Sequence, residues 1–347
     1  MNIFLINFTL SFLICLVLIN TAKKYKLFLQ NRHQNVQKVH KNFIPRLGGL
    51  SLISFYTIFI FNTDFFYNKF IIYFFIPLLI ILLGFIEDIS DSLNSKIRAI
   101  LSSLITIILI LNLDYKISEI DIEIIDKLFY YSFFSFIFMF FCLFVSIHSM
   151  NLIDGMNGLC SGYSIIIIII FTYLFYSQNL FQLSLLTTSL LGSILGFFIL
   201  NFPYPKIFLG DSGSYFLGFI IGILSIIAVN ELDNISPWFF ALVYIYPITE
   251  FLFSIIRRIY FKKNPFQSDF KHLHSIIYTF INNRNTISNS QLSNSISSFI
   301  ILNLFSYQIF ISLFFLNNKN ILLFIIFISL LIYFFTYTIF TKLNYNK

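Results

Sequence analysis

Long apolar stretches recur along the whole chain and constrain its fold more than any other feature. About 20 apolar residues in a helix cross the ~30 Å hydrocarbon core of a bilayer. Eleven stretches meet this length, near 1–22, 47–63, 70–87, 97–113, 128–149, 161–177, 180–201, 214–230, 237–256, 296–316 and 321–341. Only 11% of the residues are charged, against about 25% in soluble domains. The sequence therefore predicts an all-α, polytopic integral membrane protein with about 11 transmembrane helices.

The Lys and Arg residues divide unequally between the two alternating sets of loops. Eighteen of the 22 lie in the set that contains 23–46 and 257–295, and four lie in the other. Because cytoplasmic loops carry the excess of Lys and Arg, the first set is predicted to be cytoplasmic. The N-terminus is then outside and the C-terminus inside. No loop is long enough to form a separate domain, so 1–347 is predicted to be one transmembrane domain, with 257–295 as its largest cytoplasmic loop.

The acidic residues indicate where chemistry is placed. Eight of the 15 fall in outer loops without a motif around them and are expected to be solvated charges. The other seven lie on or near the predicted cytoplasmic side, where four short polar clusters come from four separate parts of the chain. This convergence predicts an active site on the cytoplasmic face.

The first cluster, GFIEDISDSLNSKIR, covers 84–98 at the end of one apolar stretch. Its adjacent carboxylates, Glu87 and Asp88, repel each other unless a cation or a proton offsets their charge. Lys96 and Arg98 follow and either bind an anionic phosphate or anchor the next helix. A pair of helix-end acids without a ligand is the alternative interpretation.

The second cluster, HSMNLIDGMNGL, covers 148–159. Asn151 and Asp154 are one helical turn apart, and Gly155 and Gly158 permit a tight loop with close backbone approach. Oxygen ligands in such a turn suit a hard cation such as Mg²⁺. A polar turn between two spans is the alternative.

The last two clusters add further polar groups to the same side. FLGDSGSYFLG (208–218) places Asp211 and small residues before a helix, and small residues at a helix N-terminus attract phosphate. KHLHS (271–275) contains alternating His272 and His274, which can bind phosphate or act as acid–base groups near neutral pH. A zinc site is not expected, because no Cys or further His accompanies them.

Five strings taken together resemble the polyprenyl-phosphate N-acetylhexosamine-1-phosphate transferases, which form glycosyltransferase family 4. The strings follow the order and spacing of that family: NVQKVHKNFIPRLGGL (35–50), GFIEDISDSL (84–93), NLIDGMNGL (151–159), FLGDSGSYFLG (208–218) and HLHSIIY (272–278). The stretch 236–258 and the eleven spans resemble the bacterial branch that transfers GlcNAc-1-phosphate from UDP-GlcNAc to undecaprenyl phosphate. They resemble less closely the ten-span branch that transfers phospho-MurNAc-pentapeptide.

The resemblance implies a phosphoryl-sugar transfer in the bacterial cytoplasmic (inner) membrane. A polyprenyl phosphate attacks the β-phosphate of a UDP-N-acetylhexosamine, which gives polyprenyl-diphospho-sugar and UMP. This reaction begins the synthesis of surface polysaccharides such as the O-antigen of lipopolysaccharide. The implied cofactor is Mg²⁺, with Mn²⁺ as a substitute, and membrane lipid but no nucleic acid is an expected partner. A homodimer is left open beside a monomer.

The family's residue roles carry over to matching positions of this chain. Asn151 and Asp211 would bind the metal. The implied catalytic residues are Glu87, Asp88, Asp154, His272 and His274. The implied donor-binding residues are Lys96, Gly155, Asn157, Gly158 and Phe208. Lys38, His40 and Arg46 would support the phosphate-facing loop.

Four positions depart from the common family pattern: Glu87 replaces Asp, His148 replaces Asn, Asn157 replaces Asp, and Ser275 replaces a third His. Asn157 is therefore not expected to be a catalytic acid, and the acceptor-directed role shifts toward Asp88. For Glu250, inside the 237–256 stretch, two interpretations stand: a functional group, or a structural ion pair with Arg257.

Two rival hypotheses come from other classes. A transporter would place its charges near the bilayer midplane and often shows repeat symmetry, whereas these carboxylates gather at one membrane face and the spans show no evident repeat. A non-catalytic relative is disfavoured because Asp88, Asn151, Asp154 and Asp211 are all present.

Overall fold

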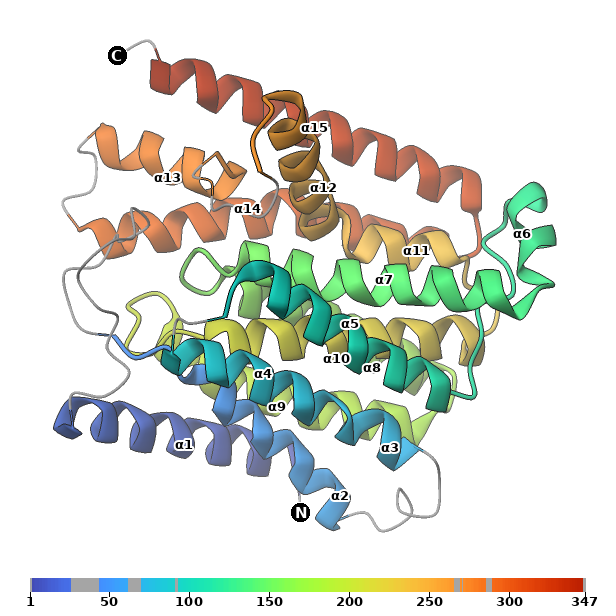
Figure 1. Ribbon diagram of the computed structural model, residues 1–347, viewed down its shortest axis with the longest axis horizontal. Helices are drawn as coiled ribbons and strands as arrows, with labels where there is room; N and C mark the ends of the chain where they lie inside the picture. Colours follow the sequence, from blue (N-terminus) through green and yellow to red (C-terminus); the bar gives the residue numbers. More distant parts are fainter. Residues whose placement is uncertain are drawn as a thin grey trace.

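The protein is a bundle of long apolar helices in a computed structural model that describes residues 2–25, 44–61, 70–90, 93–264, 269, 271–284 and 289–345. The helices follow one another in the order α1 (Ile3–Tyr25), η1 (Gly48–Tyr56), α2 (Thr57–Phe61), α3 (Phe70–Phe75), α4 (Pro77–Ser90), α5 (Ser95–Asn112), α6 (Glu123–Phe129), α7 (Ser132–Ile153), α8 (Leu159–Ser177), α9 (Phe181–Asn201), α10 (Gly210–Glu231), α11 (Pro237–Val243), α12 (Ile245–Tyr260), α13 (Leu273–Asn283), α14 (Ser290–Ser312), η3 (Leu313–Phe315) and α15 (Lys319–Tyr345). The long helices run roughly side by side (Figure 1).

The number of membrane-spanning helices differs slightly from the sequence-based prediction. Within the described ranges, nine helical segments are long and apolar enough to cross a bilayer. The pair α11 and α12, which is bent by 72° at Tyr244, brings the number to ten when it is counted as one broken span. The predicted span at 47–63 is instead the 3₁₀ helix η1 followed by the short α2, an apolar segment at Gly48–Phe61. Hydropathy marks this segment as apolar, but it does not reveal that the helix is short.

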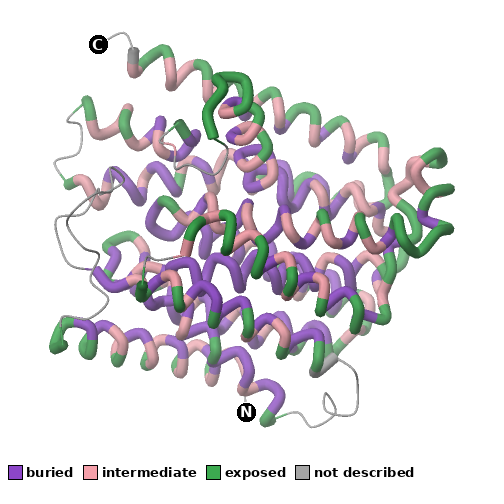
Figure 2. Tube along the Cα trace, viewed as in Figure 1, coloured by how far each residue is buried: buried purple, intermediate pink, exposed green. Residues whose placement is uncertain are grey.

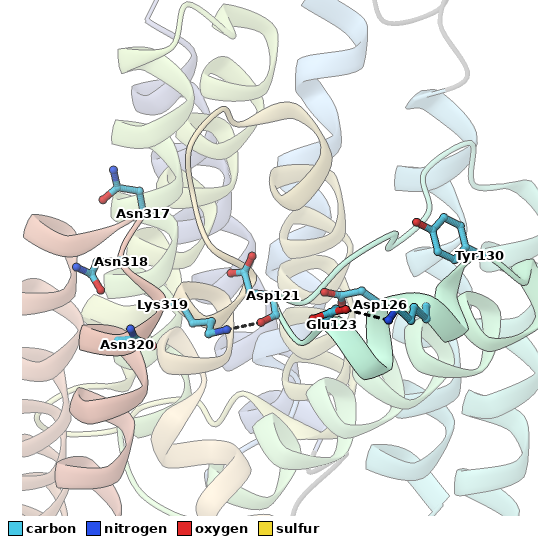
Figure 3. A pocket seen from close by; sticks show the side chains of 9 residues that line it. Asp121, Glu123, Asp126, Tyr130, Asn317, Asn318, Lys319 and Asn320 are labelled. Atoms are coloured by element: carbon cyan, nitrogen blue, oxygen red, sulfur yellow. Dashed lines mark hydrogen bonds and ion pairs between the residues drawn. The ribbon is translucent and has the colours of Figure 1, made fainter.

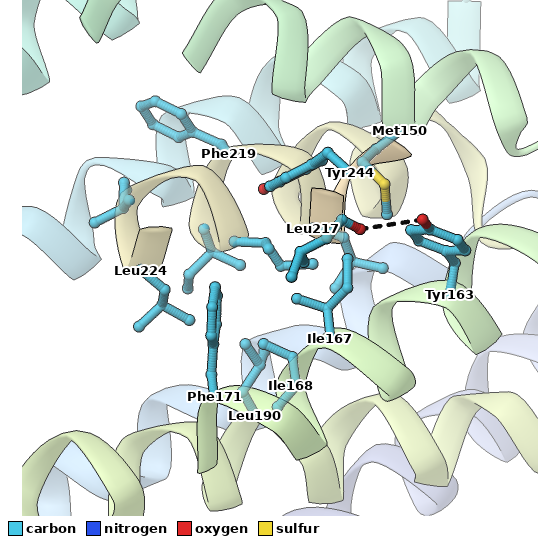
Figure 4. Packing of buried hydrophobic residues seen from close by; sticks show 14 of the residues in the cluster. Met150, Tyr163, Ile167, Ile168, Phe171, Leu190, Leu217, Phe219, Leu224 and Tyr244 are labelled. Carbon is cyan, nitrogen blue, oxygen red and sulfur yellow. Dashed lines mark hydrogen bonds between the residues drawn. The ribbon is translucent and has the colours of Figure 1, made fainter. Parts of the chain in front are cut away.

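Helix α10 forms the centre of the bundle, with α4, α7, α8 and η1 packed around it. Every residue from Gly210 to Leu224 is buried, and Figure 2 shows the buried residues concentrated in the middle of the bundle. A helix that is apolar on all sides is expected to be enclosed by other helices. Figure 4 shows how its Leu217 and Leu224 pack among Ile167, Phe171 and other large side chains.

Small residues allow α4 to cross α10 at short range. A Cβ atom on Gly84 would lie 2.3 Å from the backbone nitrogen of Ser212, so only glycine fits at this crossing. Small residues at helix contacts permit this kind of close backbone approach in membranes. Asp88 lies one turn after Gly84 and therefore on the same face of α4, which places its carboxylate at the first turn of α10.

All four polar clusters lie at one end of the bundle. The C-terminal ends of α4 and α7 and the N-terminal ends of α5, α8 and α10 meet on the left in Figure 1, with α13 nearby. The alternation of helix directions accounts for this, because every second connection returns to the same end. Segments far apart in the sequence are thereby brought to one site.

Candidate active site

The carboxylate of Asp88 is bound to the start of α10. Its Oδ1 accepts a hydrogen bond from the backbone N–H of Asp211 at 2.8 Å, and its Oδ2 accepts from the N–H of Ser212 at 3.0 Å and from the Ser212 hydroxyl at 2.7 Å. The first N–H groups of a helix have no partner within the helix, and a negative charge beside them is stabilising. Asp88 thus caps α10 from a different helix.

Glycine is required where α10 begins beside this carboxylate. Gly210 has a φ of +77°, a conformation that other residues rarely adopt. A Cβ atom at this position would also lie 2.5 Å from Asp88 Oδ2. Gly210 of the FLGDSGSYFLG string therefore lets the Asp88 carboxylate approach the start of α10.

Asp211 links residues of three of the polar clusters, 84–98, 148–159 and 208–218. Asn151 Nδ2 donates to Asp211 Oδ1 at 3.1 Å and to the Ser214 hydroxyl at 2.8 Å. Arg98 forms a short ion pair with the other carboxylate oxygen of Asp211 and lies 3.6 Å from Glu87 Oε1. The structure therefore brings Asp88, Asn151 and Asp211 into one hydrogen-bonded network. The sequence predicted that their segments meet, and their roles stay predictions. The guanidinium of Arg98 lies where the carboxylates concentrate negative charge.

Asp154 caps the C-terminal end of α7 and faces the same network. Burial raises the pKa of its carboxyl well above the usual value; Arg46 lowers this pKa, whereas Asp211 and Asp88 raise it further. The backbone of Gly210 also lowers this pKa. Three carboxylates from three separate helices thus share one electrostatic environment, in which a bound cation would be favoured.

Backbone hydrogen bonds join the FIPRLGG segment (43–49) to the start of the FLGDSGSYFLG string. Phe208 N–H donates to the carbonyl of Pro45 at 2.9 Å, and Gly48 N–H donates to the carbonyl of Phe208 at 2.8 Å. This pairing holds Arg46 close enough to lower the pKa of Asp154. Lys38 and His40 lie outside the described residues.

The histidine motif is held beside the Asp154 loop by buried groups. His272 Nδ1 lies 2.9 Å from Oε1 of the buried Glu250, and His274 Nδ1 lies 3.2 Å from the Tyr246 hydroxyl. A Cβ atom on Gly155 would lie 2.8 Å from His274 Nε2, so the two motifs are in contact. All five motif strings thus contribute described residues to this end of the bundle.

The other predicted donor-binding residues differ in how far they are exposed. Lys96 is exposed at the start of α5, and no side-chain hydrogen bond of it is found within the described part of the chain. Phe208 is half-buried and Gly155 is exposed. Gly158 has a φ of +70° and precedes α8.

Asn157 faces a neighbouring helix in this structure. Its N–H donates to Asn294 Oδ1 at 2.7 Å, and its Nδ2 lies 3.2 Å from the Ser295 hydroxyl, so the side chain holds the loop against α14. Its predicted contact with the donor stays a prediction.

The alternative ion pair between Glu250 and Arg257 is wrong. Glu250 contacts His272, whereas Arg257 binds Asp269 at 2.9 Å. The two side chains share a helix face, but the segment 269–272 supplies each with another partner, His272 for Glu250 and Asp269 for Arg257. The sequence pattern missed the contributions of Arg98 to Asp211 and of Ser212 to Asp88. For Arg98, the available signal was its position ten residues after the acidic pair, in the same polar cluster.

A separate cavity of about 950 Å³ lies at the opposite end of the bundle (Figure 3). Asp121, Glu123, Asp126 and Lys319 are among its lining residues. Two of its carboxylates have partners: Lys127 binds Glu123 at 2.8 Å, and Asp126 accepts from the Ile120 N–H at 2.7 Å. This cavity contains none of the motif residues and is not the candidate active site.

Burial lowers the pKa of His274 to about 3 from 6.5. The neighbouring His272 lowers this pKa further, and Glu250 opposes the shift. The unfolded chain therefore binds more protons than the folded protein between about pH 6.5 and 3. Stability from this residue is fully present above pH 6.5 and falls with acidification, by up to ~1.4 kcal/mol per pH unit. We expect His274→Gln to flatten the fall in melting temperature between pH 7 and 5. Equal acid slopes in the two purified proteins would contradict the neutral state of His274.

The fold and the site define a polytopic helical membrane protein with an acidic centre at one end of its bundle. Residues 70–229 match the profile of glycosyl transferase family 4. The chain is 29% identical, over 97% of its own length and 97% of the relative, to an undecaprenyl-phosphate alpha-N-acetylglucosaminyl 1-phosphate transferase of Thermotoga maritima. It is 30% identical to a phospho-N-acetylmuramoyl-pentapeptide-transferase of Staphylococcus saprophyticus, over 66% of this chain and 76% of the relative. The chain belongs to glycosyl transferase family 4.

A third relative is a second transferase of the N-acetylglucosaminyl kind. This is a probable undecaprenyl-phosphate N-acetylglucosaminyl 1-phosphate transferase of Bacillus subtilis, which is 26% identical over 70% of this chain and 68% of the relative. Relatives of both kinds are thus similar to this chain, so family membership alone does not select the donor sugar.

Proposed function

We propose that this protein transfers N-acetylglucosamine-1-phosphate from UDP-GlcNAc to a polyprenyl phosphate, undecaprenyl phosphate in bacteria. The observation that carries the proposal is the single network formed by Asp88, Asn151 and Asp211 with Arg98. The near full-length similarity to the Thermotoga maritima transferase favours GlcNAc over MurNAc-pentapeptide. The product begins surface polysaccharide assembly, such as that of O-antigen.

In the proposed reaction, an oxygen of the lipid phosphate forms a bond to the β-phosphorus of the donor. The bond from that phosphorus to the bridging oxygen breaks, and UMP leaves with the oxygen. Such a transfer depends on in-line positioning and charge neutralisation more than on covalent help from protein. Arg98, Arg46 and the two histidines supply positive or hydrogen-bonding groups around the donor phosphates, and Asp88 holds the helix start that carries Asp211.

The oxygen donors fit a hydrated Mg²⁺ that takes its remaining ligands from phosphate and water. Asp211 and Asn151 would hold the ion, and Asp154 would support this shell, once Arg98 has moved from Asp211 to the donor phosphates. The described residues contain no group of three or more His, Cys, Asp or Glu side chains arranged for a metal, so substrate oxygens are needed to complete the site. When bound, the ion neutralises charge on the diphosphate.

The excess of Lys and Arg supports a cytoplasmic position for this end of the bundle, with the N-terminus outside and the C-terminus inside. UDP-sugars would then reach the site from the cytoplasm of the bacterial cell, and the lipid acceptor would reach it from the inner membrane.

The experiment is a donor panel with purified protein, undecaprenyl phosphate and Mg²⁺. We expect UMP and lipid-linked sugar from UDP-GlcNAc, slower or no reaction with UDP-GalNAc and UDP-MurNAc-pentapeptide, and loss of turnover in EDTA that Mg²⁺ or Mn²⁺ restores. Preference for UDP-MurNAc-pentapeptide would assign the protein to the other branch. Failure of every donor with folded protein would refute the transferase function.

A further inference from the structure

A fully buried carboxylate lies directly behind the histidine motif. Glu250 of α12 has no exposed surface. Three donors surround it, two from the start of α13 and one from α15. They are His272 Nδ1 at 2.9 Å from Oε1, and the Leu273 N–H at 3.1 Å and Tyr333 hydroxyl at 3.0 Å from Oε2. Burying a carboxylate is costly unless it is paired and hydrogen-bonded. This cost makes a specific role for Glu250 more plausible than chance placement.

The hydrogen bonds of Glu250 determine which ring nitrogen of His272 is left for a ligand. An ionised carboxylate only accepts hydrogen bonds, so His272 Nδ1 carries the hydrogen. The remaining ring nitrogen, Nε2, is the one that can meet a substrate group. Leu273 is the first residue of α13, so the same carboxylate also fixes the start of that helix.

The second histidine has an anchor of the same kind. The Tyr246 hydroxyl lies 3.2 Å from His274 Nδ1, which leaves His274 Nε2 on the side of Gly155. Tyr246 and Glu250 are one turn apart on one face of α12. The two imidazole rings are nearly parallel, with a centroid separation of 5.3 Å and an interplanar angle of 8°. One helix face thus holds both histidines in register.

We propose that Glu250, Tyr246 and Tyr333 are positioning residues that hold His272 and His274 with their Nε2 atoms available to the donor diphosphate. The inference deepens the proposed function and rests on it for the identity of the ligand. Through Tyr333, the C-terminal helix α15 contributes a hydrogen bond to Glu250, although the five family strings end at residue 278.

The first test is Glu250→Gln, which keeps the side-chain volume but removes the charge and one acceptor oxygen. We expect kcat/KM for UDP-GlcNAc to fall about 10- to 100-fold, by analogy with the loss when the group that orients a metal-bound histidine is removed. The fall should be mainly in the donor KM, with the KM for undecaprenyl phosphate unchanged. Glu250→Asp, which restores the charge, should recover part of the loss.

A double-mutant cycle separates positioning from a general structural role. If Glu250 acts through His272, Glu250→Gln should cause little further loss in a protein that already carries His272→Gln. Losses that multiply in the double variant would overturn the proposal, because Glu250 would then act independently of His272.

Tyr337 provides a matched control on the same helix as Tyr333. Its hydroxyl contacts Arg257 at 2.9 Å and the Lys271 carbonyl at 3.2 Å, and no hydrogen bond to Glu250 is found for it among the described residues. We expect Tyr333→Phe to raise the donor KM and Tyr337→Phe to leave it unchanged at similar melting temperatures. Equal effects of the two variants would contradict the assignment.

A spectroscopic readout does not depend on turnover. In ¹⁵N-histidine-labelled protein without substrates, we expect His272 to be protonated at Nδ1 and its Nδ1 signal to shift in Glu250→Gln. If this holds but no donor reacts, the proposed function fails and the anchoring stands. An unprotonated Nδ1, or identical His272 signals in both proteins, would overturn the positioning role.

Discussion

Asp211→Asn will reduce sugar-1-phosphate transfer by roughly 10²- to 10³-fold or more, the range for loss of one preorganised charge-stabilising group. The substitution keeps the shape of the side chain, and Asn151 and Arg98 lose the carboxylate that they share. If Asp211 also holds Mg²⁺, the Mg²⁺ concentration for half-maximal activity will rise. Turnover at saturating UDP-GlcNAc, measured over a Mg²⁺ titration, checks both expectations.

Glu123→Gln is the control for this variant. Glu123 is an exposed acid at the opposite end of the bundle, where it pairs with Lys127 at 2.8 Å. Its replacement should leave transfer unchanged. Retention of more than a tenth of the activity in a folded Asp211→Asn protein would remove Asp211 from the reaction.

Asp88→Ala will have the largest effect on stability, because it removes the acceptor of three hydrogen bonds at the start of α10. Each buried donor left without a partner costs about 1–3 kcal/mol. We therefore expect the free energy of unfolding to fall by at least ~3 kcal/mol, and transfer to be lost because Asp211 lies on the disturbed turn. Thermal unfolding in detergent micelles, followed alongside activity, measures both.

Two further variants separate this capping role from the predicted action of Asp88 on the acceptor phosphate. Ser212→Ala removes one of the three hydrogen bonds and should cost only ~1 kcal/mol, with most activity retained. Asp88→Asn keeps one acceptor oxygen and should still lower the melting temperature. An Asp88→Asn protein of full stability and no turnover would instead favour the role on the acceptor phosphate.

The motif-based predictions were most informative about which segments meet. The acidic pair, the NLIDG string and the GDSG string each end or begin a helix, and the alternating helix directions bring those ends together. Their position at one end of the bundle could be predicted because membrane-spanning segments have only two ends. The roles of individual residues in transfer remain predictions that the variants above test.

The sequence-based predictions failed or stayed incomplete where two residues of similar chemistry could each form the same contact. Lys96 and Arg98 are two residues apart in the sequence, yet Arg98 reaches Asp211 while Lys96 is exposed. Glu250 has Arg257 on its own helix face but contacts His272 from a later segment. These outcomes depend on the angles and distances at which helices cross, which no local pattern encodes.

The sequence by itself determined that this chain is a bundle of membrane-spanning helices with its polar motifs at one end, because span length and polarity are local properties that add along the chain. Only the tertiary structure decided that α10 is the central helix, that Asp88 caps it, and that Glu250 and Tyr333 lie behind the histidines. The physical reason is that a hydrogen bond forms only between atoms within about 3 Å. Such distances are fixed by packing at close crossings such as that of Gly84 against Ser212.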